Sequence, residues 1–437
     1  MTTNNSPSPI AHSPLEAVPL GYKRTDVGVI PEDWEVKTLA DVCTPQGIVR
    51  GPFGGSLKKE MFVTSGFRVY EQKNAIYKSC EIGSYFIDES KYTEMHRFSV
   101  SPGDFIVSCS GTIGRIYQIP LDAPPGVINQ ALLKLTASKS VVNDRYFYVF
   151  FEWDDFQTRI IDSTQGGAMK NLVGMDVFKT TPLVLPPLCE QGAIAEALSD
   201  VGGLIAALDK LIAKKRAIKQ AAMQQLLTGK TRLAGFSGEW EKKKLCEVAA
   251  VSKGTQLHNS AVRNRGQFPH LNGGISPSGY ADSFNTPGET IAVSEGGNSC
   301  GYVQFMIEPY WCGGHCYSVL PRDVDNNFLY YALKVRQSSI MALRVGSGLP
   351  NVQKPALLGL DLVRPASETE QTAIATVLSD MDTEIEALER RRDKTKQIKQ
   401  GMMQQLLTGR IRLLDPTGNS KGISAGKAKD SRAEAVS

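Results

Sequence analysis

The sequence lacks both a strong net charge and a long apolar run. Its 437 residues carry 49 Lys and Arg against 45 Asp and Glu, which gives a formal net charge of only +4. The balance is also local, with 18 basic against 19 acidic residues in 20–186 and 12 against 10 in 234–364. Charge alone therefore does not indicate a nucleic-acid partner. No apolar run approaches the roughly 18 residues that cross a bilayer, so a membrane-spanning helix is not expected.

The chain also lacks a disulfide framework. Its eight cysteines are scattered along the sequence, and no secretory apolar segment is present. Reduced thiols in a cytoplasmic protein are therefore the expectation. Cys312-Gly-Gly-His-Cys316 could suggest a zinc site, but a second clear pair of ligands is missing, and the other half of the chain has no counterpart. We therefore predict that the chain binds no metal ion.

An internal repeat with an offset of 180 residues sets the architecture. Glu190-Gln-Gly-Ala-Ile-Ala-Glu-Ala-Leu-Ser-Asp200 returns as Glu370-Gln-Thr-Ala-Ile-Ala-Thr-Val-Leu-Ser-Asp380, and Met223-Gln-Gln-Leu-Leu-Thr-Gly229 returns as Met403-Gln-Gln-Leu-Leu-Thr-Gly409. Between 190 and 233, 24 of 44 residues are identical to their partners. The chain therefore contains two copies of one element.

Both copies have the apolar periodicity of a long helix, with spacings that alternate between four and three as in a coiled-coil seam. The seam residues are Ile194, Leu198, Val201, Ile205 and Leu208 in the first copy, and Ile374, Leu378, Met381, Ile385 and Leu388 in the second. About 38 residues would form a rod of roughly 57 Å. One such stripe would equally fit a buried core or a dimer contact. Two copies that flank domains favour antiparallel pairing within the chain.

The segments before the two helices begin alike and then diverge. Trp34 aligns with Trp240, and both bodies continue with short alternating strands and Gly turns of unlike sequence. We predict an α+β fold, in which two α/β domains are separated by two long helices in a pseudo-two-fold repeat. The predicted parts are a disordered tail (1–19), a first domain (20–186), a first helix (187–233), a second domain (234–364), a second helix (365–413) and a disordered tail (414–437).

Several motifs occur in an order typical of one family. They are Tyr22-Lys-Arg-Thr-Asp-Val-Gly-Val-Ile-Pro-Glu-Asp-Trp34, Pro186-Pro-Leu-Cys-Glu-Gln191, Leu226-Leu-Thr-Gly-Lys-Thr-Arg-Leu-Ala-Gly-Phe-Ser-Gly-Glu-Trp240, Glu370-Gln371 and Leu406-Leu-Thr-Gly-Arg-Ile-Arg-Leu413. In this order the chain resembles the specificity subunits of type I restriction-modification systems. The resemblance covers residues 20–413, which is nearly the whole chain.

The resemblance implies two target recognition domains, each of which binds half of a split site in double-stranded DNA. It also implies partners: two methyltransferase subunits that use S-adenosylmethionine on adenine and, in the restricting form, two ATP- and Mg-dependent nuclease subunits. The residues agree with this division, because two unlike bodies would read two unlike half-sites. The helices between them would fix the spacer, as half-site spacing is fixed in dimeric regulators.

The candidate DNA-binding residues lie in polar, Gly-rich loops, where backbone can approach phosphate and long side chains can reach base edges. In the first body they are Arg50, Lys58, Lys59, Lys73, Asn74, Ser110, Thr112, Lys170 and Asn171. In the second they are Lys253, Gln256, His258, Arg263, Arg265, Asn272, Asn298, Ser299 and Asn351. Asn171 and Asn351 are 180 residues apart, so a shared folding or backbone-contacting role suits them better than base reading.

Motifs for catalysis are missing. An Asn/Asp-Pro-Pro-aromatic motif for adenine methylation is absent, and the Pro-Pro pairs lie in Ala123-Pro-Pro-Gly126 and Leu185-Pro-Pro-Leu188. Thr228-Gly-Lys-Thr231 resembles the end of a phosphate loop, but Gln224 stands where that loop requires Gly, so we interpret the segment as a helix cap. We predict a non-catalytic subunit without a cofactor of its own. Two alternatives are an enzyme with an unrecognised centre and a coiled-coil scaffold that carries modules for other partners.

Overall fold

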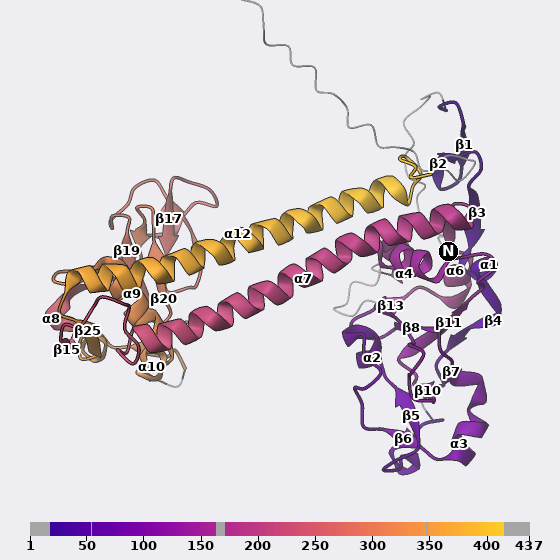
Figure 1. Cartoon of the computed structure of the whole chain (residues 1–437), viewed down its shortest axis with the longest axis horizontal. Helices are drawn as coiled ribbons and strands as arrows, with labels where there is room; N and C mark the ends of the chain where they lie inside the picture. The colour runs from indigo at the N-terminus through magenta and orange to yellow at the C-terminus, as the bar shows by residue number, and fades with distance from the viewer. Residues whose placement is uncertain (1–17, 54, 163–170, 347, 415–437) are drawn as a thin grey trace, which may run out of the picture. The chain divides into compact units, whose positions relative to one another are not determined.

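The computed structural model describes residues 18–53, 55–162, 171–346 and 348–414 (Figure 1). The predicted tails therefore fall almost wholly outside the described residues. The chain divides into two compact units, residues 1–205 with 394–437, and residues 206–393. Each unit contains one α/β body together with a stretch of both long helices, α7 (Leu188–Leu226) and α12 (Glu368–Leu406). Among the described residues no helix is long and apolar enough to cross a membrane.

The first body is built around two four-stranded sheets. The antiparallel sheet has the order β4-β11-β8-β9, with bounds β4 (Cys43–Arg50), β8 (Phe105–Ser108), β9 (Ile116–Gln118) and β11 (Leu132–Ala137). The mixed sheet has the order β6-β5-β10-β7, with bounds β5 (Phe67–Tyr70), β6 (Phe86–Ile87), β7 (Ser99–Val100) and β10 (Gly126–Ile128). In the mixed sheet β10 runs parallel to β5, which brings the loops after these two strands to the same edge.

Short helices and strand pairs complete this body. The helices are α1 (Leu39–Val42), η1 (Lys59–Met61), α2 (Gln72–Tyr77), α3 (Glu89–Glu94), η2 (His96–Phe98), α4 (Asp144–Glu152), α5 (Asp154–Ile160) and α6 (Met175–Thr180). The strand pairs are β1 (Tyr22–Thr25) with β2 (Gly28–Pro31), β3 (Glu35–Thr38) with β14 (Pro182–Leu185), and β12 (Ile161–Asp162) with β13 (Asn171–Leu172). The aromatic side chains of α4, among them Phe147 and Phe150, are buried in the core that also receives the start of α7.

The second body repeats this topology although its sequence differs. Its antiparallel sheet has the order β16-β22-β19-β20, with bounds β16 (Ala249–Lys253), β19 (Thr290–Ser294), β20 (Val303–Met306) and β22 (Cys316–Pro321). Its second sheet has the order β18-β17-β21, with bounds β17 (Phe268–Leu271), β18 (Gly279–Ala281) and β21 (Trp311–Cys312), and β21 is again parallel to β17. The two bodies therefore share one fold whose backbone positions can be compared directly.

The remaining elements of the second body also have counterparts in the first. They are β15 (Trp240–Lys244) with β25 (Asp361–Pro365), α8 (Leu245–Val248), η3 (Asn259–Ala261), α9 (Asn326–Val335), α10 (Gln337–Ala342), β23 (Arg344–Val345) with β24 (Asn351–Val352), and α11 (Lys354–Leu358). The main difference lies after the first strand of the mixed sheet. Residues 71–104 of the first body include α2 and α3, whereas residues 272–289 of the second include only the strand β18.

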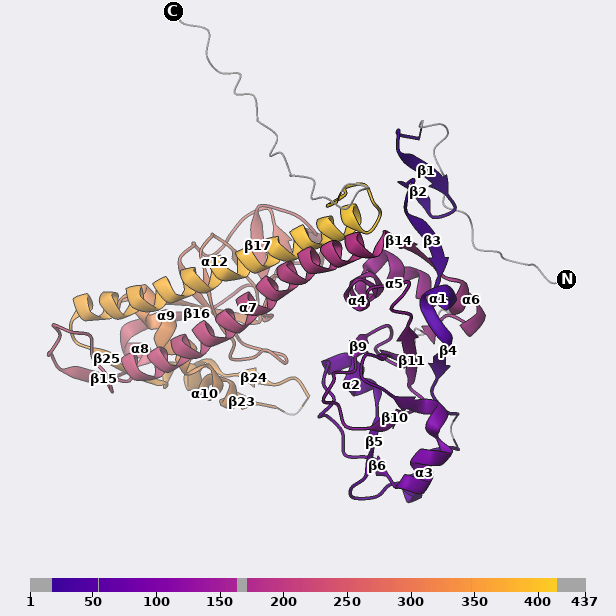
Figure 2. The same cartoon turned by 45° about the vertical axis from the view of Figure 1, so that its right-hand side comes forward.

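The two long helices pair antiparallel, as the periodicity predicts (Figures 1 and 2). In the first unit Ile194 and Leu198 of α7 are fully buried against the end of α12, and in the second unit Ile374 and Leu378 of α12 are fully buried against the end of α7. The other seam residues are buried or half-buried, namely Val201, Ile205, Leu208, Met381, Ile385 and Leu388. The predicted fold class, with its antiparallel coiled coil and its repeat, is confirmed.

The Glu-Gln pair that opens each helix is repeated for a structural reason. The Gln191 side chain accepts a hydrogen bond from the backbone N–H of Asn143 at 2.8 Å, and the Gln371 side chain accepts one from Asp325 at 2.9 Å. Asn143 and Asp325 are the N-caps of α4 and α9. Each glutamine therefore ties the start of a long helix to the body that precedes it.

The glutamates tie the start of each helix to the end of the other. Arg412, which follows α12, donates to Glu190 at 2.6 Å, and Arg232, which follows α7, donates to Glu370 at 2.9 Å. Both glutamate side chains are only 1% exposed. A buried carboxylate is stable only when its charge is paired and hydrogen-bonded, so each pair fixes one end of the coiled coil within its own unit.

Candidate nucleic-acid interface

In the second body, backbone hydrogen bonds hold the predicted loops together at one edge of the sheets. Thr255 N donates to Cys312 O at 2.9 Å, and Gly313 N donates to Leu271 O at 2.8 Å. The loop after β19 joins the same group, because the N–H of its residue 295 donates to the carbonyl of residue 315 at 2.9 Å. The structure thus brings together the loops that contain Gln256, Asn272, Asn298, Ser299 and Asn351.

Three of the predicted side chains stabilise this arrangement from within. Lys253 forms an ion pair of 2.7 Å with Glu295, whose side chain is only 12% exposed. The Asn272 side chain accepts from the N–H of His315 at 3.1 Å, and the Ser299 hydroxyl donates to Gly273 O at 2.7 Å. Each of the three side chains therefore has a polar atom that holds the loops in place.

Other predicted residues of the second body are exposed. They are Gln256, His258, Arg263, Arg265 and Asn298. His258 caps η3 by accepting from Ser260 N at 3.3 Å, and Arg263 lies 3.4 Å from Asp282 in an ion pair that is open to solvent. Exposed pairs of this kind are weak, so Arg263 can exchange its partner for a phosphate at little cost.

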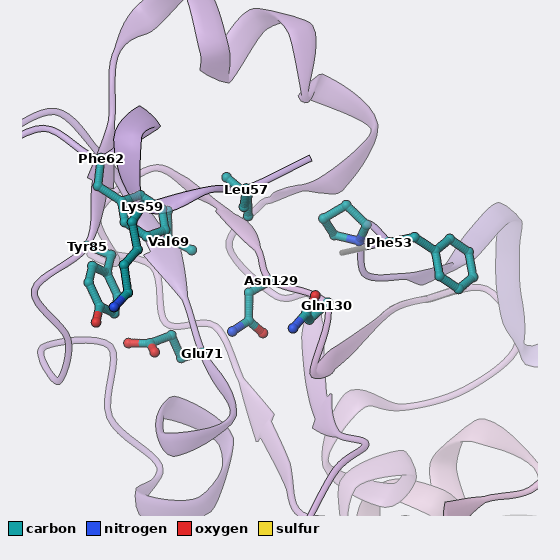
Figure 3. Close-up of a pocket in the computed structure, with 10 residues that line it drawn as sticks. Phe53, Leu57, Lys59, Phe62, Val69, Glu71, Tyr85, Asn129 and Gln130 are labelled. Carbon is teal, nitrogen blue, oxygen red and sulfur yellow. The ribbon is translucent and has the colours of Figure 1, made fainter. Parts of the chain in front are cut away.

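In the first body, the loop after β4 lies beside a small hollow of about 160 Å³ (Figure 3). Lys59 and Tyr85 line one side of the hollow, and Asn129 and Gln130 line another. Phe53 also borders it, but its ring points away and is 88% exposed (Figure 3). This edge therefore combines cationic, aromatic and amide groups with the carboxylate of Glu71.

The predicted residues around this hollow differ in availability. Lys58 and Lys59 are exposed, whereas Arg50 is half-buried at the end of β4. Lys73 pairs with Glu71 at 2.7 Å and lies over the ring of Tyr85. Ser110 and Thr112 are exposed in the loop between β8 and β9, which a hydrogen bond from the Ser108 hydroxyl to Thr112 O fixes at 2.6 Å. Lys170 lies outside the described residues.

The assignment of Asn74 to the interface is wrong. Its side chain has no exposed surface; its oxygen accepts from Glu71 N at 2.7 Å, and its NH₂ group donates to Ser79 O and Ile82 O. Asn74 thus shapes the start of α2 and the turn after it. Its place after Lys73 in a polar segment gave no signal of this burial.

Asn171 and Asn351 occupy equivalent positions at the start of β13 and β24. Asn171 is exposed, whereas Asn351 is half-buried and accepts from the Gln353 side chain at 2.5 Å. The backbone at Asn351 also forms a bridge with Gly296. These bonds give Asn351 a part in the local fold, whereas a shared role for the two residues, and their contact with DNA, stay predictions.

Sequence reasoning missed two polar residues on the turns after β10 and β21. Gln130 is exposed, and the His315 side chain is 65% exposed. Neither lies in a basic segment, and His315 stands inside the cysteine motif that invites only a zinc interpretation. The signal that identifies them is the shared topology of the two bodies, which the diverged sequences do not show.

Two of the motifs considered for catalysis or metal binding can be compared with the described residues. These residues contain no group of three or more His, Cys, Asp and Glu side chains placed to hold a metal ion. The segment at Thr228 is the end of a helix, since Gly229 has φ +71° and the Thr228 hydroxyl donates to Gln224 O at 2.6 Å. This is the expected geometry of a left-handed C-cap.

Comparisons with known proteins agree with this architecture. The chain matches the family described as "Type I restriction modification DNA specificity domain" twice, at residues 31–217 and 237–400. A relative from Mycoplasma genitalium is 36% identical over 152 residues, which are 34% of this chain and 39% of that protein. The chain thus matches less than half the length of that relative.

Two longer likenesses cover most of the chain. The specificity subunit of the type I restriction enzyme MjaVIII from Methanocaldococcus jannaschii is 24% identical over 420 residues, or 88% of this chain and 94% of that protein. The crystal structure of the type I restriction-modification S subunit from M. genitalium has the same fold, with a TM-score of 0.58 at 17% identity over 85% of this chain and 96% of that one. With both copies of its domain matched over most of its length, this chain belongs to the type I restriction-modification DNA specificity family.

Proposed function

We propose that the chain is the sequence-reading, non-catalytic subunit of a type I restriction-modification complex. It binds a bipartite, asymmetric site in double-stranded DNA, and each body reads one half-site. Two methyltransferase subunits, which use S-adenosylmethionine, methylate adenine at the chosen site in the cytoplasm. Two nuclease subunits that use ATP and Mg²⁺ cleave DNA in the restricting form of the complex.

The observation that carries this proposal is one fold presented twice with different loop chemistry. The sheet orders β4-β11-β8-β9 and β16-β22-β19-β20 coincide in register, while the loops that follow equivalent strands have unlike side chains. Two domains that recognise different DNA sequences can share one backbone fold but need different polar side chains, because side chains at base edges recognise the sequence.

The two helices support a role as a spacer. Each comprises 39 residues without a break, and residues near both ends of each helix are buried in a body's core. Seven residues inserted in α7 and seven at the facing position of α12 would preserve the seam and add roughly 10 Å to the helix pair. We expect the unread spacer to lengthen by up to about three base pairs, given the rise of 3.4 Å per base pair. Insertion in α7 alone is the control, since it breaks the pairing and should abolish methylation.

The test is the pattern of adenine methylation across a genome. A host that lacks other adenine methyltransferases receives the partner methyltransferase with this chain or without it. We expect a bipartite motif with unlike halves only when the chain is present. An unchanged methylome beside an active methyltransferase contradicts the proposal, and methylation by the purified chain alone would favour the alternative of a complete enzyme.

A further inference from the structure

The turns after β10 and β21 are equivalent by their hydrogen bonds. Asn129 N donates to Tyr70 O at 2.9 Å in the first body, and Gly313 N donates to Leu271 O at 2.8 Å in the second. Each turn closes in the same way, because the N–H of residue 132 bonds to the carbonyl of residue 129, and that of residue 316 to residue 313, both at 3.1 Å. Asn129-Gln130-Ala131 therefore corresponds to Gly313-Gly314-His315.

Each turn lies in close contact with the loop that follows β4 in the first body and β16 in the second. A Cβ atom on Gly51 would lie 1.9 Å from the carbonyl oxygen of Asn129, and a Cβ atom on Gly254 would lie 2.3 Å from that of Gly313. Glycine is therefore required at both places for the approach of the two backbones. The turn is thereby held beside the loop that contains Lys58 in the first body and Gln256 in the second.

The two bodies place amide groups at this point from different segments of the chain. In the first body the amides belong to the turn itself, as Asn129 and Gln130. In the second body the turn has glycines, and a Cβ atom on Gly313 would meet the Asn272 side chain at 2.6 Å, while one on Gly314 would meet Gln256 at 3.0 Å. The side chains of Asn272 and Gln256 thus occupy the space beside the glycine turn.

The hydrogen bonds of these amide side chains divide them into two kinds: those that hold the turn in place and those that are exposed for contact with a base. The Asn129 oxygen accepts from Ala131 N at 3.0 Å, and the Asn272 oxygen accepts from His315 N at 3.1 Å. Both asparagines therefore fix the turn. Gln130 and Gln256 are exposed beside them, and the Gln256 NH₂ group donates to the neighbouring carbonyl of Leu257 at 3.2 Å, a bond it would exchange on contact with a base. Figure 3 shows Gln130 next to Asn129 at the rim of the hollow. Glutamine amides contact adenine with two hydrogen bonds, as donor and acceptor together.

We propose that this turn and the loop packed against it form the base-reading element of each body. Gln130 of the turn reads one half-site, and Gln256 of the adjacent loop reads the other together with His315 of the turn. The inference rests on the proposed function and names the residues that carry it out. Asn129 and Asn272 are positioning residues. Lys58 and Lys59 in the first body, and Arg263 and Arg265 in the second, contact phosphates and carry no sequence information.

Methylome sequencing tests this assignment in cells that contain the partner methyltransferase and a variant of the full chain. For Gln130→Ala we expect one half-site to accept a second base at one position, with discrimination reduced at least about fivefold and the other half-site unchanged. For His315→Ala we expect the same relaxation in the opposite half-site. Lys58→Ala is the matched control, since it should lower methylation of all sites evenly and leave the motif intact.

The outcomes separate this inference from the function on which it rests. If the unmodified chain directs no bipartite motif, both fail. If it does, but Gln130→Ala and His315→Ala keep the full motif or relax the same half-site, only the base-reading assignment is overturned. Gln130→Glu, which keeps the size of the side chain but removes its NH₂ donor, gives a second reading should the alanine variant accumulate poorly.

Discussion

The two ends of the coiled coil use the same pair of charged residues in different surroundings. In the first unit Arg412 donates to Glu190 and also to both carboxylate oxygens of Asp33, at 2.7 and 2.8 Å, while the Trp34 indole N–H donates to Glu190 at 3.0 Å. In the second unit Arg232 donates to Glu370 and to a backbone carbonyl, that of Gly238. The aligned indole N–H, on Trp240, is buried without a hydrogen-bond partner.

The two ends of the coiled coil thus share one interaction and differ in another. The Glu–Arg pair is common to both ends, because each end buries a carboxylate that requires a cation. The hydrogen bond from tryptophan belongs to one end only, although the two tryptophans align in sequence. Hydrogen bonds to Glu190, and then to Asp33, also raise the pKa of the Arg412 guanidinium despite its burial. The first end is therefore the more fully bonded of the two.

Removal of the arginines should have the largest effect on stability. Loss of one partner from a buried ion pair costs about 3–5 kcal/mol. We expect Arg232→Ala to lie at the upper end of this range, because Trp240 offers Glu370 no hydrogen bond in its place. Arg412→Ala should cost less, since Trp34 still donates to Glu190. Urea unfolding, with hydrogen exchange to assign each transition to its unit, measures both.

Arg390→Ala is the control for these two variants. Arg390 pairs with Glu386 on the same helix, and both side chains are more than 60% exposed. An exposed pair of this kind contributes less than about 1 kcal/mol. A greater loss for Arg412→Ala than for Arg232→Ala would show that the tryptophan bond does not compensate for the missing guanidinium and its two bonds to Asp33.

The glycines that end the long helices should come next. Gly409 and Gly229 have φ +72° and +71°, so alanine at either position costs about 1–2 kcal/mol in the left-handed region. A Cβ atom on Gly409 would also lie 2.4 Å from the ring of Pro31, whereas one on Gly229 would lie 3.2 Å from Trp240. We therefore expect Gly409→Ala to cost roughly 2–4 kcal/mol, because overpacking adds to the strain.

Thermal unfolding of both glycine variants checks this order. Gly401→Ala is the control, since Gly401 lies within α12 and a Cβ atom there meets nothing within 4 Å. Alanine at that position should stabilise the helix by about 0.5–1 kcal/mol. Equal losses for Gly409→Ala and Gly229→Ala would mean that the chain before Trp34 moves aside without cost.

The sequence was sufficient to predict the two repeated helices. It was insufficient to predict the shared fold of the two bodies, whose sequences differ. The identical residues at an offset of 180 reveal the two helices, and the heptad spacing of their apolar residues predicts which face of each helix is buried. The common topology of the two bodies has no such signal, because strand register depends on alternating apolar residues whose identity is free to change. The equivalence of Gln130 and Gln256 is less accessible still, since the two residues come from different loops. Asn74 shows the same limit at short range, because only the fold decides that its amide is buried.

The tryptophans give the smallest and most selective prediction. Trp34→Phe removes a hydrogen bond to a buried carboxylate, which is worth about 1.5–3 kcal/mol, whereas Trp240→Phe removes a buried donor without an acceptor and should be close to neutral. Because Trp34 is fully buried, part of its loss could come from a cavity. Measuring Trp34→Phe in the Arg412→Ala background separates the two causes. A cavity would cost the same free energy of unfolding in both backgrounds. Without Arg412, however, the Trp34 indole is the donor that Glu190 retains, so loss of this hydrogen bond should cost more there than in the unmodified chain. An equal cost in both backgrounds would assign the effect of Trp34 to packing alone.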